Sequence, residues 1–368
     1  MRVLHLIAPV SFGGGEALLA QLVSKGRPGL SEAVCGLYDA PRFASALAAT
    51  GTPFLPVRRT ELGHGAPRGR MLRDLLADPA VMILAMRVAH RFSADLIHAH
   101  GFPAVAVAAA LRAWRPRLAV VYTHHFVRAV PGRLEAAAFA PIYAACHRLT
   151  GVSGPVCRTM EAAFPSLSGR MIHIPNAVAD AFWNAAPDPR WALPTGRRIV
   201  VHAARFLPFK NQRLVVDALH RLDPALRDRL CVVFAGDGPE RTAVESAAGG
   251  LGDAVRFPGA IDHADLPGLV ARADFGLFPS EEEGFGIAAA ECLAAGKPVL
   301  ALDNRLMQEV IGDGGVLVPR DRLDLGFAEL LARGDGLREA ARQKAGAYRL
   351  DRIRDAYLAV YHEARACR

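Results

Sequence analysis

Two carboxylates beside a short apolar run have types and spacing suited to holding hydroxyl groups or to acid–base work. Glu283 stands at the tip of a loop that follows the run 275–278, and Glu291 lies in the alanine-rich segment 287–295, which is expected to be a helix. Open parallel sheets bind ligands at the carboxyl ends of their strands, where this loop and this helix would begin. The alternative is a solvated acidic loop with a helix-stabilising glutamate.

Two cations occupy an equivalent place in another predicted strand-to-helix loop. Arg205 and Lys210 follow the apolar run 198–203, at the same end of the sheet as Glu283. They are placed to converge on a diphosphate, and Gly284 and Gly286 leave the backbone free to point N–H groups at the same anion. An ordinary surface ion pair remains the alternative.

A third glycine-rich loop follows the first apolar run. Gly13, Gly14 and Gly15 precede a predicted helix, so the backbone there can approach an anion. A dinucleotide fingerprint fits poorly because Leu18 stands where its third glycine belongs. A tight turn that binds no ligand is the other interpretation of this loop.

Alternating apolar runs and helical segments predict the parallel sheets that must position these loops. The predicted strands are 2–8, 33–37, 95–99, 119–123, 148–152 and 171–174, then 198–203, 230–234, 255–257, 275–278, 298–302 and 315–318. The proline-interrupted stretch 184–190 predicts a boundary between domains 1–185 and 186–350. A terminal helix within 351–368 carries an apolar stripe that must be buried.

Composition limits the class of protein. The chain has 368 residues, 52% hydrophobic and 22% charged, which favours two globular domains over disorder. Six dispersed cysteines without a C-x-x-C pair argue against a disulfide scaffold, and the apolar start is too short for a signal peptide. We therefore expect a cytoplasmic protein.

The positive charge is concentrated in the first half of the chain. Residues 1–185 hold 19 Lys and Arg against 10 Asp and Glu, whereas residues 186–368 hold 25 against 26. The most basic stretch, from Arg58 to Arg73, precedes apolar residues at helical spacing. Peripheral contact with an anionic membrane and an ordinary solvated face are equally compatible with this pattern.

Together these residues resemble the GT-B glycosyltransferases of family 4, which are retaining and use nucleotide-sugars. The most specific piece is Glu283-x7-Glu291 with Arg205-x4-Lys210 upstream. The other matching pieces are Gly13-Gly14-x-Glu16, Thr123-x-His125, Ile174-Pro175-Asn176-Ala177-Val178 and Ala235-Gly236-Asp237-Gly238-Pro239-Glu240. The chain departs from the pattern in its doubled His124-His125 and in Ala177, where relatives more often carry glycine.

The resemblance implies an α/β GT-B fold with two Rossmann-like, doubly wound parallel-sheet domains facing a cleft. The C-terminal helix would cross back to the first domain. The first domain would bind the acceptor, and the second would bind most of a nucleoside diphosphate-sugar. No cofactor and no metal are expected, because fixed cations and a helix N-terminus would stabilise the departing phosphate.

The resemblance also assigns roles to individual residues. Glu283 and His125 would hold the donor sugar near the reaction centre, and Arg205 and Lys210 would stabilise the leaving group. Glu291 would hold the ribose hydroxyls. The remaining donor-binding positions would be Gly13, Gly14, Arg256, Phe257, Gly284, Phe285, Gly286 and Ile287.

The other histidines fit either of two roles, core residue or metal ligand. His98 and His100 flank Ala99 at the end of a strand and are expected to point to opposite faces of the sheet. With no cysteine or carboxylate near them or near His124 and His125 in the sequence, a metal site is rejected.

The expected reaction moves a sugar to a hydroxyl of a glycan, a lipid-linked or a small-molecule acceptor, with no nucleic-acid partner. A phosphorylase or nucleotide-sugar epimerase on the same scaffold is the first alternative. A non-catalytic nucleotide-sugar-binding subunit is the second. The donor base, the sugar, the acceptor and the oligomeric state leave no trace in the residue types.

Overall fold

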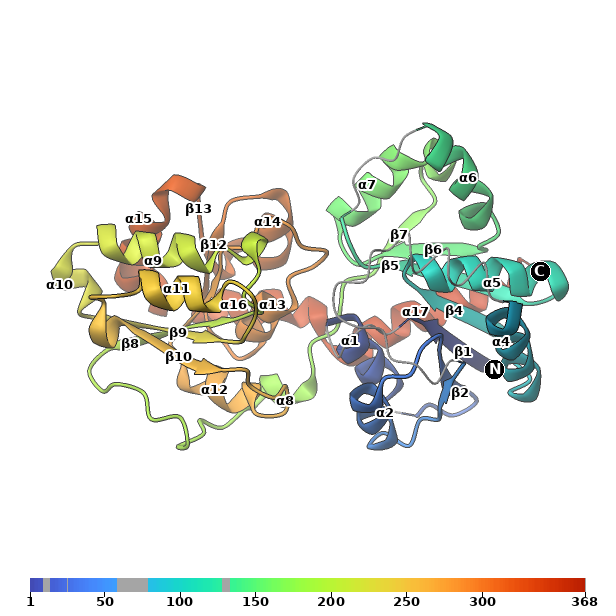
Figure 1. The fold of residues 1–368 in the computed structure, drawn as a ribbon, viewed down its shortest axis with the longest axis horizontal. Coiled ribbons are helices and arrows are strands. Elements are labelled where there is room, and N and C mark those ends of the chain that lie inside the picture. Colours follow the sequence, from blue (N-terminus) through green and yellow to red (C-terminus); the bar gives the residue numbers. More distant parts are fainter. Residues whose placement is uncertain (9–13, 25, 58–78, 128–132, 368) are drawn as a thin grey trace. The chain divides into compact units, whose positions relative to one another are not determined.

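The protein consists of two compact units, each built on one parallel sheet (Figure 1). The computed structural model describes residues 1–8, 14–24, 26–57, 79–127 and 133–367. Unit 1 comprises Met1–Ala177 with Leu350–Arg368, and unit 2 comprises Val178–Arg349. The predicted α/β class with two Rossmann-like sheets is confirmed.

The sheet of unit 1 has seven strands in the order β3-β2-β1-β4-β5-β6-β7. All neighbouring strands pair in parallel. The central residues of β1, β4 and β5 are buried, which explains the continuous apolar runs in the sequence, whereas the short outer strands β3 and β7 are only partly buried. The strands are β1 (Arg2–Ile7), β2 (Ser31–Gly36), β3 (Phe54–Pro56), β4 (Leu96–His100), β5 (Ala119–His124), β6 (Arg148–Gly151) and β7 (Met171–His173).

Helices cover both faces of this sheet (Figure 1). One apolar cluster joins α4, α5, α6 and α7 to the sheet, and two others join α1, α2 and α17 to it. The helices are α1 (Gly14–Val23), α2 (Pro41–Ala48), α4 (Pro79–Arg91), α5 (Phe102–Trp114), α6 (Arg133–Ala144), α7 (Gly154–Ala163) and α17 (Leu350–Ala366). The predicted terminal helix is therefore α17, and its apolar stripe is buried in unit 1.

Strand β3 is the one described strand of unit 1 that the sequence did not predict. It has three residues, lies at the edge of the sheet and ends in Pro56. Proline cannot donate to a strand ladder and is confined to such edges. A run this short carries no periodic signal.

The sheet of unit 2 has six parallel strands in the order β10-β9-β8-β11-β12-β13. They are β8 (Arg198–Ala203), β9 (Leu230–Ala235), β10 (Val255–Gly259), β11 (Phe275–Phe278), β12 (Val299–Leu302) and β13 (Gly315–Val318). An apolar cluster packs α9, α11 and α15 on one face, whereas α12 contacts β8 and α13 contacts β11 and β12. The helices are α8 (Asp180–Trp183), α9 (Gln212–Arg221), α10 (Pro224–Arg227), α11 (Arg241–Ala247), α12 (Leu266–Arg272), α13 (Ile287–Ala294), α14 (Arg305–Ile311), α15 (Leu323–Arg333) and α16 (Arg338–Ala345).

Residues 178–185 belong to unit 2, although the prediction placed the boundary after residue 185. Val178 forms a parallel bridge with Arg349, and its N–H donates to Tyr348 O at 2.9 Å. Helix α8 then contacts α12 and α13. These contacts tie the segment to the second sheet before the prolines are reached.

None of the described helices combines the length and apolar character that crossing a lipid bilayer requires.

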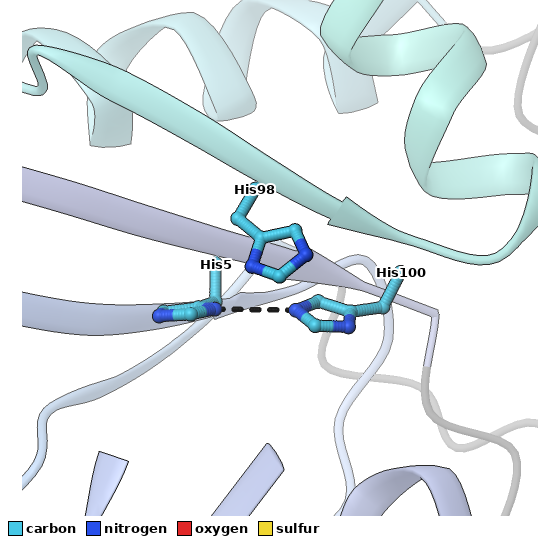
Figure 2. Close-up of side chains that lie close together, drawn as sticks. All are labelled: His5, His98 and His100. Atoms are coloured by element: carbon cyan, nitrogen blue, oxygen red, sulfur yellow. Dashed lines mark hydrogen bonds between the residues drawn. The ribbon is translucent and has the colours of Figure 1, made fainter. Parts of the chain in front are cut away.

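The expectation that His98 and His100 face opposite sides of the sheet is wrong. Residues two apart on a strand share a face, and the two imidazole rings lie 4.0 Å apart between centroids. Both side chains are buried, and His5 of β1 lies beside them (Figure 2). Burial lowers the pKa of His98 and of His100 well below the usual value.

These two histidines make unit 1 sensitive to mild acid. The unfolded chain binds protons at both side chains near pH 6.5, whereas the folded unit does not, so stability is present above that pH and declines below it. Each group contributes about 1.4 kcal/mol per pH unit. Urea unfolding followed by circular dichroism should show a free energy of unfolding lower by about 2–3 kcal/mol at pH 5.5 than at pH 6.5 from this source.

The variant H98Q is the control for that measurement. It should lose about half of the pH dependence assigned to the pair, because one of the two proton-binding sites of the unfolded chain is gone. An unchanged slope in H98Q would contradict the assignment.

Candidate active site

Lys210 and Glu283 meet at the carboxyl edge of the sheet of unit 2. Strand β8 leads into the one-turn helix η2 (Pro208–Lys210), and β11 leads into the loop that carries Glu283. Because β8 and β11 are neighbouring parallel strands, their following loops lie side by side. Lys210 Nζ donates to Glu283 Oε1, and the side chains are only 17% and 18% exposed. The structure therefore brings these two predicted site residues together.

Asn211 holds the two loops in register. Its backbone adopts the left-handed conformation at φ 57°, which asparagine tolerates better than most residues. Its Nδ2 donates to Pro279 O at 2.9 Å, and its Oδ1 accepts from Arg320 at 3.1 Å. In addition, Glu281 N donates to Phe209 O at 3.2 Å. Asn211 is not among the residues predicted from the sequence, although an asparagine in a strand-to-helix loop is a usable signal.

Arg205 lies in the same loop, with its side chain exposed. Gln212 Nε2 donates to Arg205 O at 2.9 Å, which fixes the backbone at this position. The described residues offer the guanidinium no hydrogen bond or ion pair. A charged group presented in this way can bind an incoming anion without first breaking a contact.

The loop after Glu283 forms the start of α13. Gly284 and Phe285 are buried, and the Phe285 ring packs edge-on against Tyr348 at 5.2 Å between centroids. Gly286 is the N-cap residue with φ 86°, and a Cβ there would lie 3.0 Å from Met307 Cε. Ile287 begins the helix, whose N-terminal N–H groups carry partial positive charge towards the same edge.

Glu291 is buried on α13 and is bound by a histidine that the sequence analysis did not single out. His263 Nε2 lies 3.1 Å from Glu291 Oε1, and the glutamate side chain is 3% exposed. Burial raises the pKa of Glu291, against the effect of this hydrogen bond, and the same bond raises the pKa of His263. His263 follows β10 at the carboxyl edge of the sheet. This position after a strand is the one feature of the sequence that could have indicated a site residue here.

Two buried polar side chains lie where β8 and β11 end. His202 donates from Nδ1 to Leu277 O at 2.9 Å, and burial lowers its pKa to about 4, so its Nε2 holds a lone pair. Within the described parts of the chain, His202 Nε2 and Ser280 Oγ lack a hydrogen-bond partner. Buried polar atoms without a partner are rare in folded proteins.

Gly236 and Gly238 allow the loop after β9 to lie against the loop that carries Arg205. A Cβ at Gly236 would lie 2.0 Å from Ala204 O, and one at Gly238 would lie 2.5 Å from Phe206 O. Phe206 N donates to Asp237 O at 2.9 Å across this contact. Only glycine permits so close an approach.

Arg256 and Phe257 occupy β10, the outer strand of this sheet. The Arg256 guanidinium pairs with Asp253, just before the strand, and Phe257 stacks on Phe234 at 5.1 Å between centroids. The structure therefore holds the Arg256 side chain at the amino end of the strand, away from Glu283. A role in binding a base would fall to the backbone of these residues.

The remaining predicted site residues belong to unit 1. His125 follows β5, is partly buried, and lies 3.3 Å from His100 Nδ1 through its Nε2. Burial lowers the pKa of His125 to about 4. His124 is buried and bonded to Tyr122, so His125 is the more accessible of the doubled histidines. Gly14 is the first residue of α1, whereas Gly13 lies outside the described residues.

The arrangement in unit 2 is suited to an anion with attached hydroxyl groups. Cations from the β8 loop and N–H groups from α13 face one edge of the sheet, where Glu283 offers acceptor oxygens, whereas Glu291 is buried and bonded to His263. Charge-assisted bonds of this kind are about twice as strong as neutral ones. The same set can stabilise negative charge that develops during bond cleavage.

Comparison with known families supports this interpretation. A family described as "Glycosyl transferases group 1" matches residues 187–346. A second, described as "Glycosyltransferase Family 4", matches residues 41–182. Between them the two matches cover most of both units.

Curated relatives match part of the chain. A D-inositol 3-phosphate glycosyltransferase of Geodermatophilus obscurus is 36% identical over 182 residues, covering 45% of this chain and 40% of the relative. A GDP-mannose-dependent alpha-(1-6)-phosphatidylinositol dimannoside mannosyltransferase of Mycobacterium tuberculosis is 39% identical over 123 residues, covering 33% and 31%. The matched region thus spans less than half the length of either relative.

Solved structures share the fold over the whole chain. Anabaena Alr3699/HepE in complex with UDP superposes with a TM-score of 0.79, covering 98% of this chain and 100% of the other at 19% identity. At that identity the likeness shows the GT-B architecture alone.

The close approach at Gly236 predicts a large effect of one methyl group. G236A must push Ala204 away and displace the loop that carries Arg205, so unit 2 should lose about 1–3 kcal/mol of stability. G346A is the matched control, because nothing lies within 4 Å of a Cβ there. Thermal unfolding of both variants checks this, and equal melting temperatures would contradict the proposed contact.

Proposed function

Because the chain belongs to the GT-B glycosyltransferases of the family 4 type, we propose that it transfers a sugar from a nucleoside diphosphate-sugar to an acceptor hydroxyl. The anomeric configuration is retained. The observation that carries the proposal is the convergence of Lys210 and Glu283, from two neighbouring loops, in front of α13. The donor would bind at this edge of unit 2.

The ion pair between Lys210 and Glu283 has a chemical consequence for donor binding. In the unliganded protein each charge neutralises the other. A diphosphate oxygen would compete for Lys210 Nζ and leave Glu283 able to accept hydrogen bonds from sugar hydroxyls. The exposed Arg205 would bind the same diphosphate. Binding would therefore convert an internal ion pair into two contacts with the substrate.

As the bond between the anomeric carbon and the β-phosphate oxygen breaks, negative charge grows on that oxygen. Arg205, Lys210 and the N–H groups at Gly286 and Ile287 would stabilise it, so the reaction needs neither a bound metal nor a cofactor. The acceptor oxygen forms its bond to the anomeric carbon on the same face, and its proton passes to the departing phosphate. Glu291 would hold the ribose hydroxyls.

Retention without a covalent intermediate is preferred because a mechanism through such an intermediate needs a pair of carboxyl groups. Retaining glycosidases place two carboxyl groups about 5–5.5 Å apart. The sequence offers no clear second carboxylate for that mechanism. The acceptor would bind to unit 1, with His125 hydrogen-bonded to the donor sugar.

Charge substitutions at the site should separate binding from turnover. E283Q should lower turnover about 100-fold or more, since a group aimed at the reacting sugar is lost. It should bind the nucleoside diphosphate at least as tightly as the parent, because the Glu283 carboxylate no longer competes for Lys210. K210M should instead weaken that binding about 10-fold. Calorimetry with UDP, GDP and ADP, and hydrolysis of the matching sugar donors in the presence of EDTA, measure both effects.

R213M is the control for these substitutions. Arg213 is an exposed cation on α9 that pairs with Asp217, so its loss should leave binding and turnover unchanged. Full turnover in E283Q would remove Glu283 from the mechanism. Loss of turnover in EDTA would contradict metal independence, and epimerisation or phosphorolysis would favour the alternative enzymes.

We also propose a cytoplasmic location with peripheral contact at an anionic membrane, where a lipid-linked acceptor would be met. The support is the basic charge of residues 1–185. The stretch from Arg58 to Arg73 lies outside the described residues. A glycan or small-molecule acceptor needs no such contact.

Sedimentation with anionic liposomes tests the membrane proposal. The protein should sediment at low salt and remain in solution at high salt. Binding should be lost when glutamine replaces Arg58, Arg59, Arg68, Arg70 and Arg73. It should persist when glutamine replaces five exposed arginines of unit 2, namely Arg213, Arg221, Arg229, Arg272 and Arg333. No sedimentation at low salt ends the proposal.

A further inference from the structure

A row of histidines follows one face of the sheet of unit 1. His5 of β1 lies opposite His98 of β4, and His100 lies opposite Thr123 of β5. His125 comes two residues after Thr123, so it continues on the same face. The row therefore runs from the interior of the sheet to the loop where a site residue is predicted.

Hydrogen bonds link part of this row into one chain. Glu32 Oε1 lies 3.2 Å from His5 Nε2, and His5 Nδ1 lies 3.1 Å from His100 Nε2 (Figure 2). His100 Nδ1 in turn lies 3.3 Å from His125 Nε2. Behind Glu32, Arg354 of α17 places Nη2 3.6 Å from the other carboxylate oxygen. The chain thus begins at an ion pair and ends at His125.

A chain of neutral imidazoles has a direction, because each ring has one donor and one acceptor nitrogen. An ionised Glu32 can only accept, so the proton of His5 lies on Nε2. His5 Nδ1 then accepts from His100 Nε2. His100 Nδ1 accepts in the same way from His125 Nε2. The arrangement leaves the lone pair of His125 on Nδ1.

Burial supports the neutral state of His100 and of His125. His5 and His100 are 0% and 4% exposed, and desolvation lowers the pKa of His100 and of His125. The nearby charges of Glu32 and Arg354 offset each other. A second positive charge in this cluster would therefore be costly.

The same geometry argues against a metal ion between His5, His98 and His100, whose ligand atoms lie within 4.8 Å of one another. Every ring nitrogen of the three already has a partner. His98 bonds to Tyr361 through Nδ1 and to Thr123 through Nε2, both at 2.7 Å. His98 therefore stands beside the chain and is not a member of it.

We propose that Glu32, His5 and His100 are positioning residues that fix the tautomer of His125 and make its Nδ1 an obligate hydrogen-bond acceptor. The inference rests on the proposed function in one respect, namely that His125 contacts the donor sugar. An acceptor nitrogen selects a hydroxyl group, which can donate to it. It gives no hydrogen bond to a carboxylate or phosphate oxygen at the same place.

Histidine ¹⁵N resonances of the unliganded full chain test the chain of bonds directly. Long-range ¹H–¹⁵N correlation at pH 7.5, with His125 assigned by the H125N variant, should show a protonated Nε2 and an unprotonated Nδ1. In E32Q the amide can donate as well as accept, so the direction is no longer imposed. The Nδ1 resonance of His125 should then move towards the protonated range.

Y361F is the matched control, since it removes a partner of His98 from the same buried cluster and leaves the chain intact. It should leave the His125 resonances in place. A protonated Nδ1 in the parent protein, or identical His125 spectra in the parent and E32Q, would overturn the proposal.

Donor-sugar hydrolysis separates this inference from the proposed function. E32Q should lower kcat/KM about 10-fold, whereas Y361F should stay within about 2-fold of the parent. If E32Q changes the tautomer and leaves kcat/KM unchanged, the proposed contact between His125 and the donor sugar is contradicted. The proposed chain of hydrogen bonds is then still supported. If the parent has no hydrolytic activity, the resonances still decide the inference.

Discussion

The parallel arrangement of strands imposes the constraint on which the site in unit 2 depends. Every strand of this sheet runs in the same direction, so every strand-to-helix loop leaves from one edge. Residues 73 positions apart in the sequence, Lys210 and Glu283, meet there because β8 and β11 are neighbours. Neither loop could form this ion pair alone. The chemistry is thus a property of strand order, and the apolar core that fixes this order fixes the site with it.

Lys210 and Glu283 are largely shielded from water at this edge. Contacts between the surrounding loops hold the two side chains in place. Asn211 uses both ends of its amide to join three segments, and Gly236 admits a backbone approach that a methyl group would block. A partly buried ion pair gains little unless its partners are held in place. In the proposed reaction a diphosphate would take the place of Glu283 on Lys210, and these contacts would hold the loop backbones in place for it.

Much of this site could be predicted from the sequence because its main residues follow strands directly. The run 275–278 is apolar and is followed by Pro279, and the run 198–203 has an apolar centre at 199–201, so the loops that carry Arg205, Lys210 and Glu283 were identifiable. His263 could not be found, since its bond to Glu291 spans 28 residues and depends on how β10 and α13 pack. Strand β3 was too short to show a period. The boundary at Val178 depends on its pairing with Arg349, which no local pattern reveals.

The histidines of unit 1 include one expectation from the sequence that the structure overturns. His125 is the accessible member of the doubled pair, yet the faces of His98 and His100 were assigned against the period of a strand. Because His98 and His100 share a face, this face of the sheet carries a row of buried polar side chains that packing alone does not explain. Such a row costs stability unless every nitrogen is bonded, and here the bonds run in sequence from an ion pair to a partly exposed ring. A core that needed only packing would have aliphatic side chains at these positions, as it has at Val3, Leu96 and Val121 on the same face.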